Sequence, residues 1–83
     1  MDPEELLTAL SQGREIEFEH RGRKYFLQPD YDNSDSDYIL YDCTSPESNV
    51  VFHGPINAVM SFKFGGKCSL KQDLPEFYFT CIL

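Results

Sequence analysis

With 83 residues, the chain is short enough that we expect a single α+β domain over residues 1–83, built around one hydrophobic core. Fourteen acidic residues against seven basic ones give a formal net charge of -7, which argues against direct binding to nucleic acid or to an anionic membrane surface. The three cysteines are widely spaced, no signal-peptide pattern precedes them, and no apolar run reaches the length of a membrane span. We therefore expect a cytoplasmic protein with free thiols.

The first predicted element is a helix over residues 2–11. Asp2 is of the residue type that caps a helix, and Pro3 suits the first helical position. An apolar stripe with helical spacing follows, formed by Leu6, Leu7 and Leu10. Gly13 predicts the end of this helix.

The segment 14–28 predicts a β-hairpin. Apolar and charged residues alternate along it, and Arg21-Gly22 stands where a two-residue turn would fall. This turn sets the register, which pairs Ile16 with Leu27, Phe18 with Tyr25, and Glu19 with Lys24. The first two pairs then share an apolar face and the third lies on a polar face.

The rest of the chain predicts three more strands and a second helix. Strands are expected at 38–44 and 50–54, and a helix from Pro55 to a stop at Gly65-Gly66. Ser69 and Gln72 favour one capped helical turn that Pro75 closes, and the alternation in 76–83 predicts a last strand inside the sheet, with Ile82 facing away from Phe79. The predicted fold is a mainly antiparallel sheet of about five strands with two helices on one face, in the order α-β-β-β-β-α-β.

The loop from Asp30 to Asp37 is the most acidic stretch of the sequence. Its first positions are similar to a calcium-binding loop, but Asp35 stands where that loop needs glycine, and Tyr41 where it needs glutamate. Residues of these types are also common in ordinary solvated turns. We therefore expect no metal here.

Charge is distributed unevenly along the chain, because no Lys or Arg occurs between Tyr25 and Phe62. Such asymmetry favours binding to a protein with a basic surface, and aromatic residues in the same region are typical of interfaces. A solvated acidic face is the alternative. The expected partner-binding residues are Asp30, Tyr31, Asp32, Asp35, Asp37, Tyr38 and Asp42.

The patterns of reactive residues do not favour catalysis or a cofactor. Cys43 and Cys68 are candidate nucleophiles, yet neither lies in a motif with His20 or His53. No two Cys or His residues have the spacing typical of zinc ligands, and the sequence around Gly66 lacks the other residues of a phosphate-binding loop. We expect no enzyme, no metal and no cofactor, with a thiol-dependent enzyme as the alternative.

Two segments carry a resemblance to a known group of proteins. LLTALSQGREIEFEHRGRKYFLQ and VFHGPINAVMSFKFGGKCSLKQ resemble small proteins of Gram-positive bacteria and of their phages and mobile elements. Those proteins share an initial helix, an E-I-E-F hairpin and a late G-K-S-L segment, whereas this chain has Arg14 and His20 in place of the usual Lys and Tyr. The resemblance implies no catalytic residues, but it implies a setting in which small acidic proteins often inhibit defence or nucleic-acid enzymes.

Together these patterns predict a small acidic protein that binds another protein and has no enzymatic activity. A narrower alternative is an acidic inhibitor that mimics nucleic acid in the basic groove of an enzyme. Another is a homodimer formed through an unpaired sheet edge.

Overall fold

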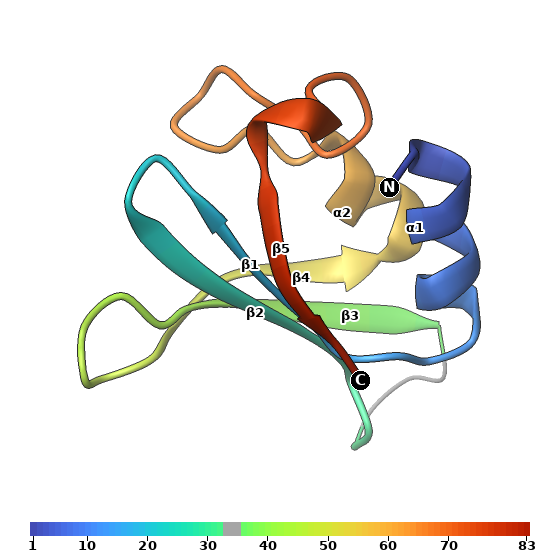
Figure 1. Cartoon of the computed structure of the whole chain (residues 1–83). Coiled ribbons are helices and arrows are strands. Elements are labelled where there is room, and N and C mark those ends of the chain that lie inside the picture. Colours follow the sequence, from blue (N-terminus) through green and yellow to red (C-terminus); the bar gives the residue numbers. More distant parts are fainter. Residues whose placement is uncertain (33–35) are drawn as a thin grey trace.

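The computed structural model in Figure 1 describes residues 1–32 and 36–83. Within these residues an antiparallel sheet of five strands carries two α-helices on one face, which confirms the predicted α+β fold and the order of its elements. The elements are α1 (Pro3–Ser11), β1 (Ile16–His20), β2 (Arg23–Pro29), β3 (Asp37–Asp42), β4 (Asn49–Pro55), α2 (Ile56–Ser61), the 3-10 helix η1 (Leu74–Glu76) and β5 (Tyr78–Ile82).

Helix α1 begins as its sequence predicts. The Oδ1 atom of Asp2 accepts a hydrogen bond from the backbone N–H three residues later at 2.9 Å, and Pro3 at the first position has no N–H to leave unsatisfied. Leu6 and Leu10 are buried against the sheet, whereas Leu7 at the margin of the apolar stripe keeps 36% of its surface exposed. The helix therefore presents one leucine of its stripe to solvent.

The hairpin of β1 and β2 has the predicted register. Ile16 pairs with Leu27, Phe18 with Tyr25, and Glu19 with Lys24. Arg21 and Gly22 have φ angles of 50° and 79°, the left-handed conformation that a tight turn between twisted strands requires. Strands β3 and β4 continue the meander, and the strand order across the sheet is β4-β3-β2-β1-β5.

One face of the sheet and the two helices enclose the core. Alternate residues of β1, β2 and β3 are buried, as the two-residue period of a strand requires. The apolar residues with the least exposure are Leu6, Leu10, Ile16, Phe18, Leu27, Leu40, Val59 and Leu70. The opposite face of the sheet has no helix packed on it in Figure 1.

The prediction that the last strand lies inside the sheet is wrong, because β5 pairs with β1 alone and forms an edge. Both faces of β5 are largely apolar for a different reason, which is a β-bulge. The register shifts between Glu17 and Phe18, so that Phe18 pairs with Phe79 and Glu17 with Cys81, and Thr80 becomes an extra residue. This bulge reverses the alternation, and both Phe79 and Ile82 pack on the core.

The second helical region differs from its prediction in two details. Helix α2 ends at Ser61, because the backbone of Phe62 leaves the helical conformation with a ψ angle of 134° and its ring packs on Phe52 and Phe64. The Oγ atom of Ser69 caps the next turn as predicted, accepting from Gln72 N at 3.1 Å. Pro75, however, lies inside η1 rather than closing the turn, since a proline fits the first turn of a helix.

Neither α1, α2 nor any other helix of the described residues combines the length and the apolar character that a membrane crossing needs.

Candidate functional site: a groove between the helices

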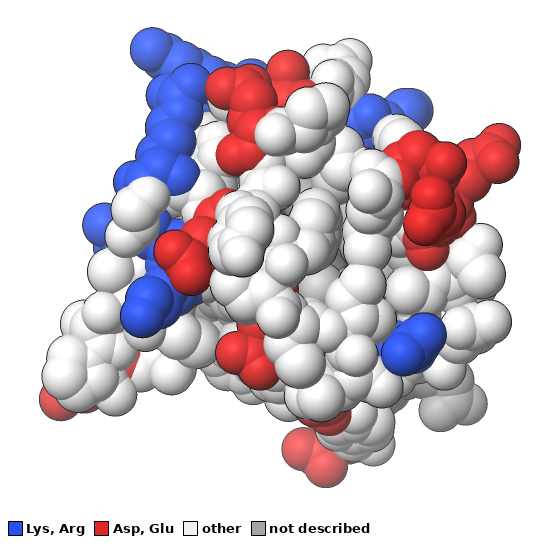
Figure 2. Space-filling model, viewed as in Figure 1, with Lys and Arg blue, Asp and Glu red and all other residues white. Residues whose placement is uncertain are grey.

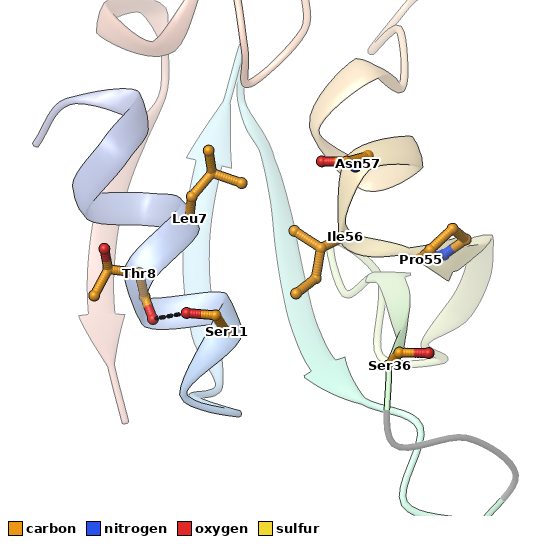
Figure 3. A pocket seen from close by; sticks show the side chains of 7 residues that line it. All are labelled: Leu7, Thr8, Ser11, Ser36, Pro55, Ile56 and Asn57. Carbon is orange, nitrogen blue, oxygen red and sulfur yellow. Dashed lines mark hydrogen bonds between the residues drawn. The ribbon is translucent and has the colours of Figure 1, made fainter.

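A hollow of about 450 Å³ lies between α1 and α2, and Figure 3 shows the side chains of Leu7 and Ile56 pointing into it from the two helices. A second hollow of about 240 Å³ shares Leu7 and Asn57 with the first and therefore continues it. We call the two together the helix groove. Its lining residues are Pro3, Leu7, Thr8, Ser11, Ser36, Pro55, Ile56, Asn57, Met60, Ser61 and Lys71.

The connection from β4 to α2 shapes one wall of the helix groove. Strand β4 ends at Pro55 and α2 begins at the next residue, so no loop covers Ile56. Gly54 lets the ring of Phe52 pack close to the backbone here, because a Cβ atom at this position would lie 3.2 Å from the ring and the ring would have to shift. This wall of the groove thus follows directly on the end of β4.

Carboxylates border the helix groove on the far side of α1. A further hollow of about 330 Å³ has three acidic residues, Asp2, Glu4 and Glu5, and one basic residue, Arg14, in its lining, and it shares Thr8 with the helix groove. Figure 2 shows red atoms gathered at the upper right, where Figure 1 places the start of α1. An apolar surface thus lies next to a mainly acidic one.

The acidic loop reaches the other end of the helix groove. Ser36 lines the groove, and the following residue, Asp37, pairs with Pro55 at the end of β4. Asp37 is half-buried, and its Oδ2 atom lies 3.8 Å from Nε2 of His53. Asp35, which the sequence places in the expected binding surface, lies outside the described residues.

The expectation that Asp30 belongs to an exposed acidic surface is wrong, because its side chain is only 3% exposed. Its Oδ2 atom lies 2.8 Å from Nε2 of His53 on β4, and its Oδ1 atom accepts a hydrogen bond from Asp32 N at 3.2 Å. This carboxylate therefore fastens the loop to the sheet, and it has no surface to offer a partner.

Asp42 and Tyr38 are also buried, so they are not part of an exposed acidic surface and offer little area to a partner. Asp42 accepts hydrogen bonds from Arg23 Nε at 2.8 Å and from the hydroxyl of Thr44 at 2.7 Å. Burial raises the pKa of Asp42, but the hydrogen bonds from Thr44 and Arg23 outweigh burial and lower it overall. The Tyr38 hydroxyl donates to Leu10 O at 2.7 Å, and burial raises its pKa to about 12.

Tyr31 and Asp32 are the predicted residues that face solvent. Tyr31 is 67% exposed, and its hydroxyl donates to Oε2 of Glu15 at 2.6 Å. This hydrogen bond is the largest cause of a raised pKa of the Tyr31 phenol, and partial desolvation is the second cause. Together with Asp37, these residues give the loop end an acidic surface that is smaller than the one the sequence predicts.

The thiol of Cys68 has the opposite electrostatics to an activated nucleophile. Burial of Cys68 and its hydrogen bond to Oε2 of Glu76 at 3.3 Å both raise the pKa of the thiol. Cys43 accepts a contact from the Ser48 hydroxyl at 3.5 Å. The surroundings of Cys68 therefore give no support to a thiol-dependent enzyme that uses this residue.

The helix groove itself was not among the sites that the sequence predicts. Its signal was nevertheless present, because Leu7 extends the apolar stripe of α1 by one residue beyond what Leu6 and Leu10 need to reach the core. The position of Ile56 opposite Leu7 depends on tertiary structure, and no local pattern in the sequence reveals it.

No protein-family model matches this chain, and searches of curated proteins and of solved structures give no match either. The resemblance to small proteins of Gram-positive bacteria and their phages thus stays a prediction, and the proposals below depend on the geometry of the chain alone.

Proposed function

We propose that the protein acts by binding a partner protein, without catalysis, and that the helix groove receives an apolar segment of that partner. The observation that carries the proposal is the pair of apolar side chains, Leu7 and Ile56, that face each other across a surface hollow between two helices. Grooves of this kind accept the apolar face of a helix or an extended segment.

The charges around the helix groove indicate the chemistry of the partner. Asp2, Glu4 and Glu5 border it on one side, and Asp37 lies next to Ser36 at its end. Two basic residues, Lys71 in the groove and Arg14 in the bordering hollow, are outnumbered by these four carboxylates. A segment with apolar side chains flanked by Lys or Arg would match both features, since opposite charges steer association and fix orientation. We therefore expect a basic partner, as the sequence predicts, but on a different surface.

The narrower alternative, an acidic mimic of nucleic acid, has less support in the structure. A mimic needs a row of exposed carboxylates, yet Asp30 and Asp42 are buried and paired within the molecule. Red atoms in Figure 2 lie in separate groups, and blue atoms gather at the left, where Figure 1 places the β1–β2 hairpin. The surface of this face is mixed rather than uniformly acidic.

Dimerisation through a sheet edge is a separate proposal. The two edge strands are β4 and β5, and each has exposed apolar side chains, Val50 at 60% and Tyr78 at 69%. Unpaired strand edges can pair with a second copy of the chain. The mass in solution, measured by sedimentation over a range of concentrations, tests it.

A library of displayed peptides tests the helix groove without knowledge of the natural partner. Selection on the wild-type protein should recover peptides that combine apolar residues with Lys or Arg. Leu7→Glu should weaken the binding of these peptides at least about tenfold, which corresponds to about 1.4 kcal/mol. Val51→Glu is the matched control, because Val51 is 39% exposed, nearly the same as Leu7, and does not line the groove. Equal weakening by both variants, or selection of acidic peptides, would contradict the proposal.

A further inference from the structure

One end of the helix groove differs in chemistry from the rest of it. This end is the hollow of about 240 Å³, which lies between the start of α1 and the end of α2 and is lined by Pro3, Leu7, Asn57, Met60, Ser61 and Lys71. The hollow of about 450 Å³ continues it toward Ser11 at the end of α1 and Pro55 at the start of α2. The groove therefore runs along both helices, with Lys71 at one end.

The smaller hollow has an apolar side and a polar side. Met60, only 3% exposed, and Leu7 belong to the apolar side. Asn57 and Ser61 are four positions apart, which places them on the same face of α2, and Figure 3 shows Asn57 on the side of α2 that faces α1. Lys71 N donates to Met60 O at 3.0 Å, so the backbone of Lys71 is held beside the end of α2.

The polar side of the hollow offers hydrogen-bond donors. The amide of Asn57, the hydroxyl of Ser61 and the ammonium of Lys71 can all donate. These three residues are exposed, and within residues 1–32 and 36–83 no hydrogen bond or ion pair engages their side chains. A ligand can therefore bind them without breaking a contact inside the protein.

The charge at this end is positive. Among the described residues that line either hollow of the groove, Lys71 is the only charged one. Asp2 and Glu4 flank Pro3 in the sequence, but they line the hollow on the other side of α1, and Asp73 accepts a hydrogen bond from Ser69 N at 3.0 Å. These carboxylates reduce the positive potential at long range, where salt screens it over about 10 Å, whereas hydrogen bonds to a bound anion act at contact.

We propose that this end of the helix groove binds the C-terminal residue of the partner, with its apolar side chain against Leu7 and Met60 and its carboxylate at Lys71. The inference rests on the proposed function, because it assigns which part of the apolar segment lies at this end. A C-terminal residue carries its carboxylate and its side chain on the same Cα atom, so both fit one small hollow, whereas an Asp or Glu side chain brings a carboxylate without a large apolar group. Capture of a chain-terminal carboxylate is a recurring mode of peptide recognition.

The size of the hollow agrees with a single residue. Sites for drug-sized ligands have volumes of about 300–1,000 Å³, and this hollow is smaller. The preceding residues of the partner then pass between Leu7 and Ile56. A Lys or Arg among them meets the mainly acidic hollow, which adjoins the groove at Thr8.

Peptides displayed with free C-termini test the inference. Selection on the wild-type protein should recover peptides whose last residue is apolar. The best peptide, synthesised with a C-terminal amide, should bind at least about tenfold more weakly than the same peptide with a free carboxylate. Lys71→Gln should weaken the free-carboxylate peptide at least about threefold, and Lys67→Gln is the matched control, because Lys67 is an exposed lysine outside the groove.

The coupling between the two changes isolates the contact. Amidation of the peptide should reduce affinity less in Lys71→Gln than in the wild type, and thermal unfolding shows whether each variant is folded. Equal affinities of acid and amide, an equal effect of amidation on both proteins, or an empty selection would overturn the inference.

Leu7→Glu separates this inference from the proposed function. If Leu7→Glu weakens the selected peptides but amidation does not, the groove binds a segment and the assignment of its C-terminal residue is wrong. If Leu7→Glu leaves their affinity unchanged, the groove itself is not the binding surface.

Discussion

Two carboxylates at opposite ends of the sheet, Asp30 and Asp42, each meet a nitrogen of a basic side chain at 2.8 Å. Each also accepts a backbone N–H from two residues later, Asp32 N at 3.2 Å and Thr44 N at 3.0 Å. The two pairs differ in their basic partners. Arg23 carries a permanent charge, whereas His53 is charged only when protonated.

The two pairs show that a carboxylate in an acidic stretch of sequence need not lie on the surface. Both residues stand where the sequence predicts a contact surface, and both instead hold a loop against the sheet. The negative charge available to a partner is therefore found on other residues, such as the first turn of α1 and Asp32. Removing each carboxylate in turn tests how much of the fold depends on it.

The largest effect is expected for Asp42→Ala. The change leaves the backbone N–H of Thr44 and the Nε–H of Arg23 without their acceptor, and lost hydrogen bonds to a buried charged group cost about 2 kcal/mol. Chemical denaturation at neutral pH measures this as a fall in the free energy of unfolding. A fall of less than about 0.5 kcal/mol would show that the Asp42 carboxylate contributes little to the stability of the fold.

Acid should remove the contribution of Asp42 with a defined sign. Because the pKa of Asp42 is lower in the folded protein than in the unfolded chain, its carboxylate stabilises the fold above the unfolded value of about 3.9. The stabilisation is lost as the pH falls through the folded pKa. The difference in unfolding free energy between wild type and Asp42→Asn should therefore shrink below about pH 4, and a constant difference would contradict this.

A smaller loss is expected for Asp30→Asn. The amide keeps an oxygen that can accept from Asp32 N, but it loses the charge that pairs with His53, which is 45% exposed. We expect a loss of about 1 kcal/mol, less than for Asp42→Ala, since the exposed imidazole regains water. His53→Gln provides the matched variant on the other side of the pair, and a double-mutant cycle gives the coupling between them.

The free energy of unfolding should also depend on pH through His20, at the end of β1. Here folding favours the uncharged form of the side chain, whereas for Asp42 it favours the charged form. Burial lowers the pKa of His20, so below the unfolded value of about 6.5 the unfolded chain binds a proton that the folded protein resists. The free energy of unfolding should consequently decline between about pH 7 and pH 5, and less so in His20→Gln. Identical pH profiles for the two proteins would show that His20 is protonated equally in both states.

The smallest effect is expected for Asp32→Asn. Asp32 is exposed, and a surface substitution of this kind changes the free energy of unfolding by less than about 0.5 kcal/mol. The same variant should slightly weaken the binding of a basic partner. Its affinity for that partner should also depend less on salt concentration than the affinity of the wild type, because one charge has been removed. A large loss of stability would mean that the loop end depends on this charge as well.

Local signals in the sequence predicted most of the fold. The alternation around Phe18 and the turn at Gly22 determined the hairpin register, and the cap at Asp2 determined the start of α1. The edge position of β5 was missed because strand order depends on packing between distant segments. The bulge at Thr80 was missed because it makes both faces of an edge strand resemble an interior one.

The candidate site was less predictable than the fold. Burial of Asp30 depends on His53, which lies 23 positions later in the chain and on another strand. The helix groove depends on the placement of Ile56 beside α1. Composition indicates that a surface is acidic, but only tertiary contacts decide which carboxylates remain free to act on a partner.

The most direct test of the helix groove is photo-crosslinking in the cell, followed by affinity measurements with the protein that is identified. A photoreactive residue at Leu7 should capture a partner that the same residue at Val51 does not. The purified partner should bind wild type and Val51→Glu equally, and Leu7→Glu at least about tenfold more weakly. Equal capture from both positions, or equal affinity for Leu7→Glu, would contradict the assignment of this groove as the binding surface.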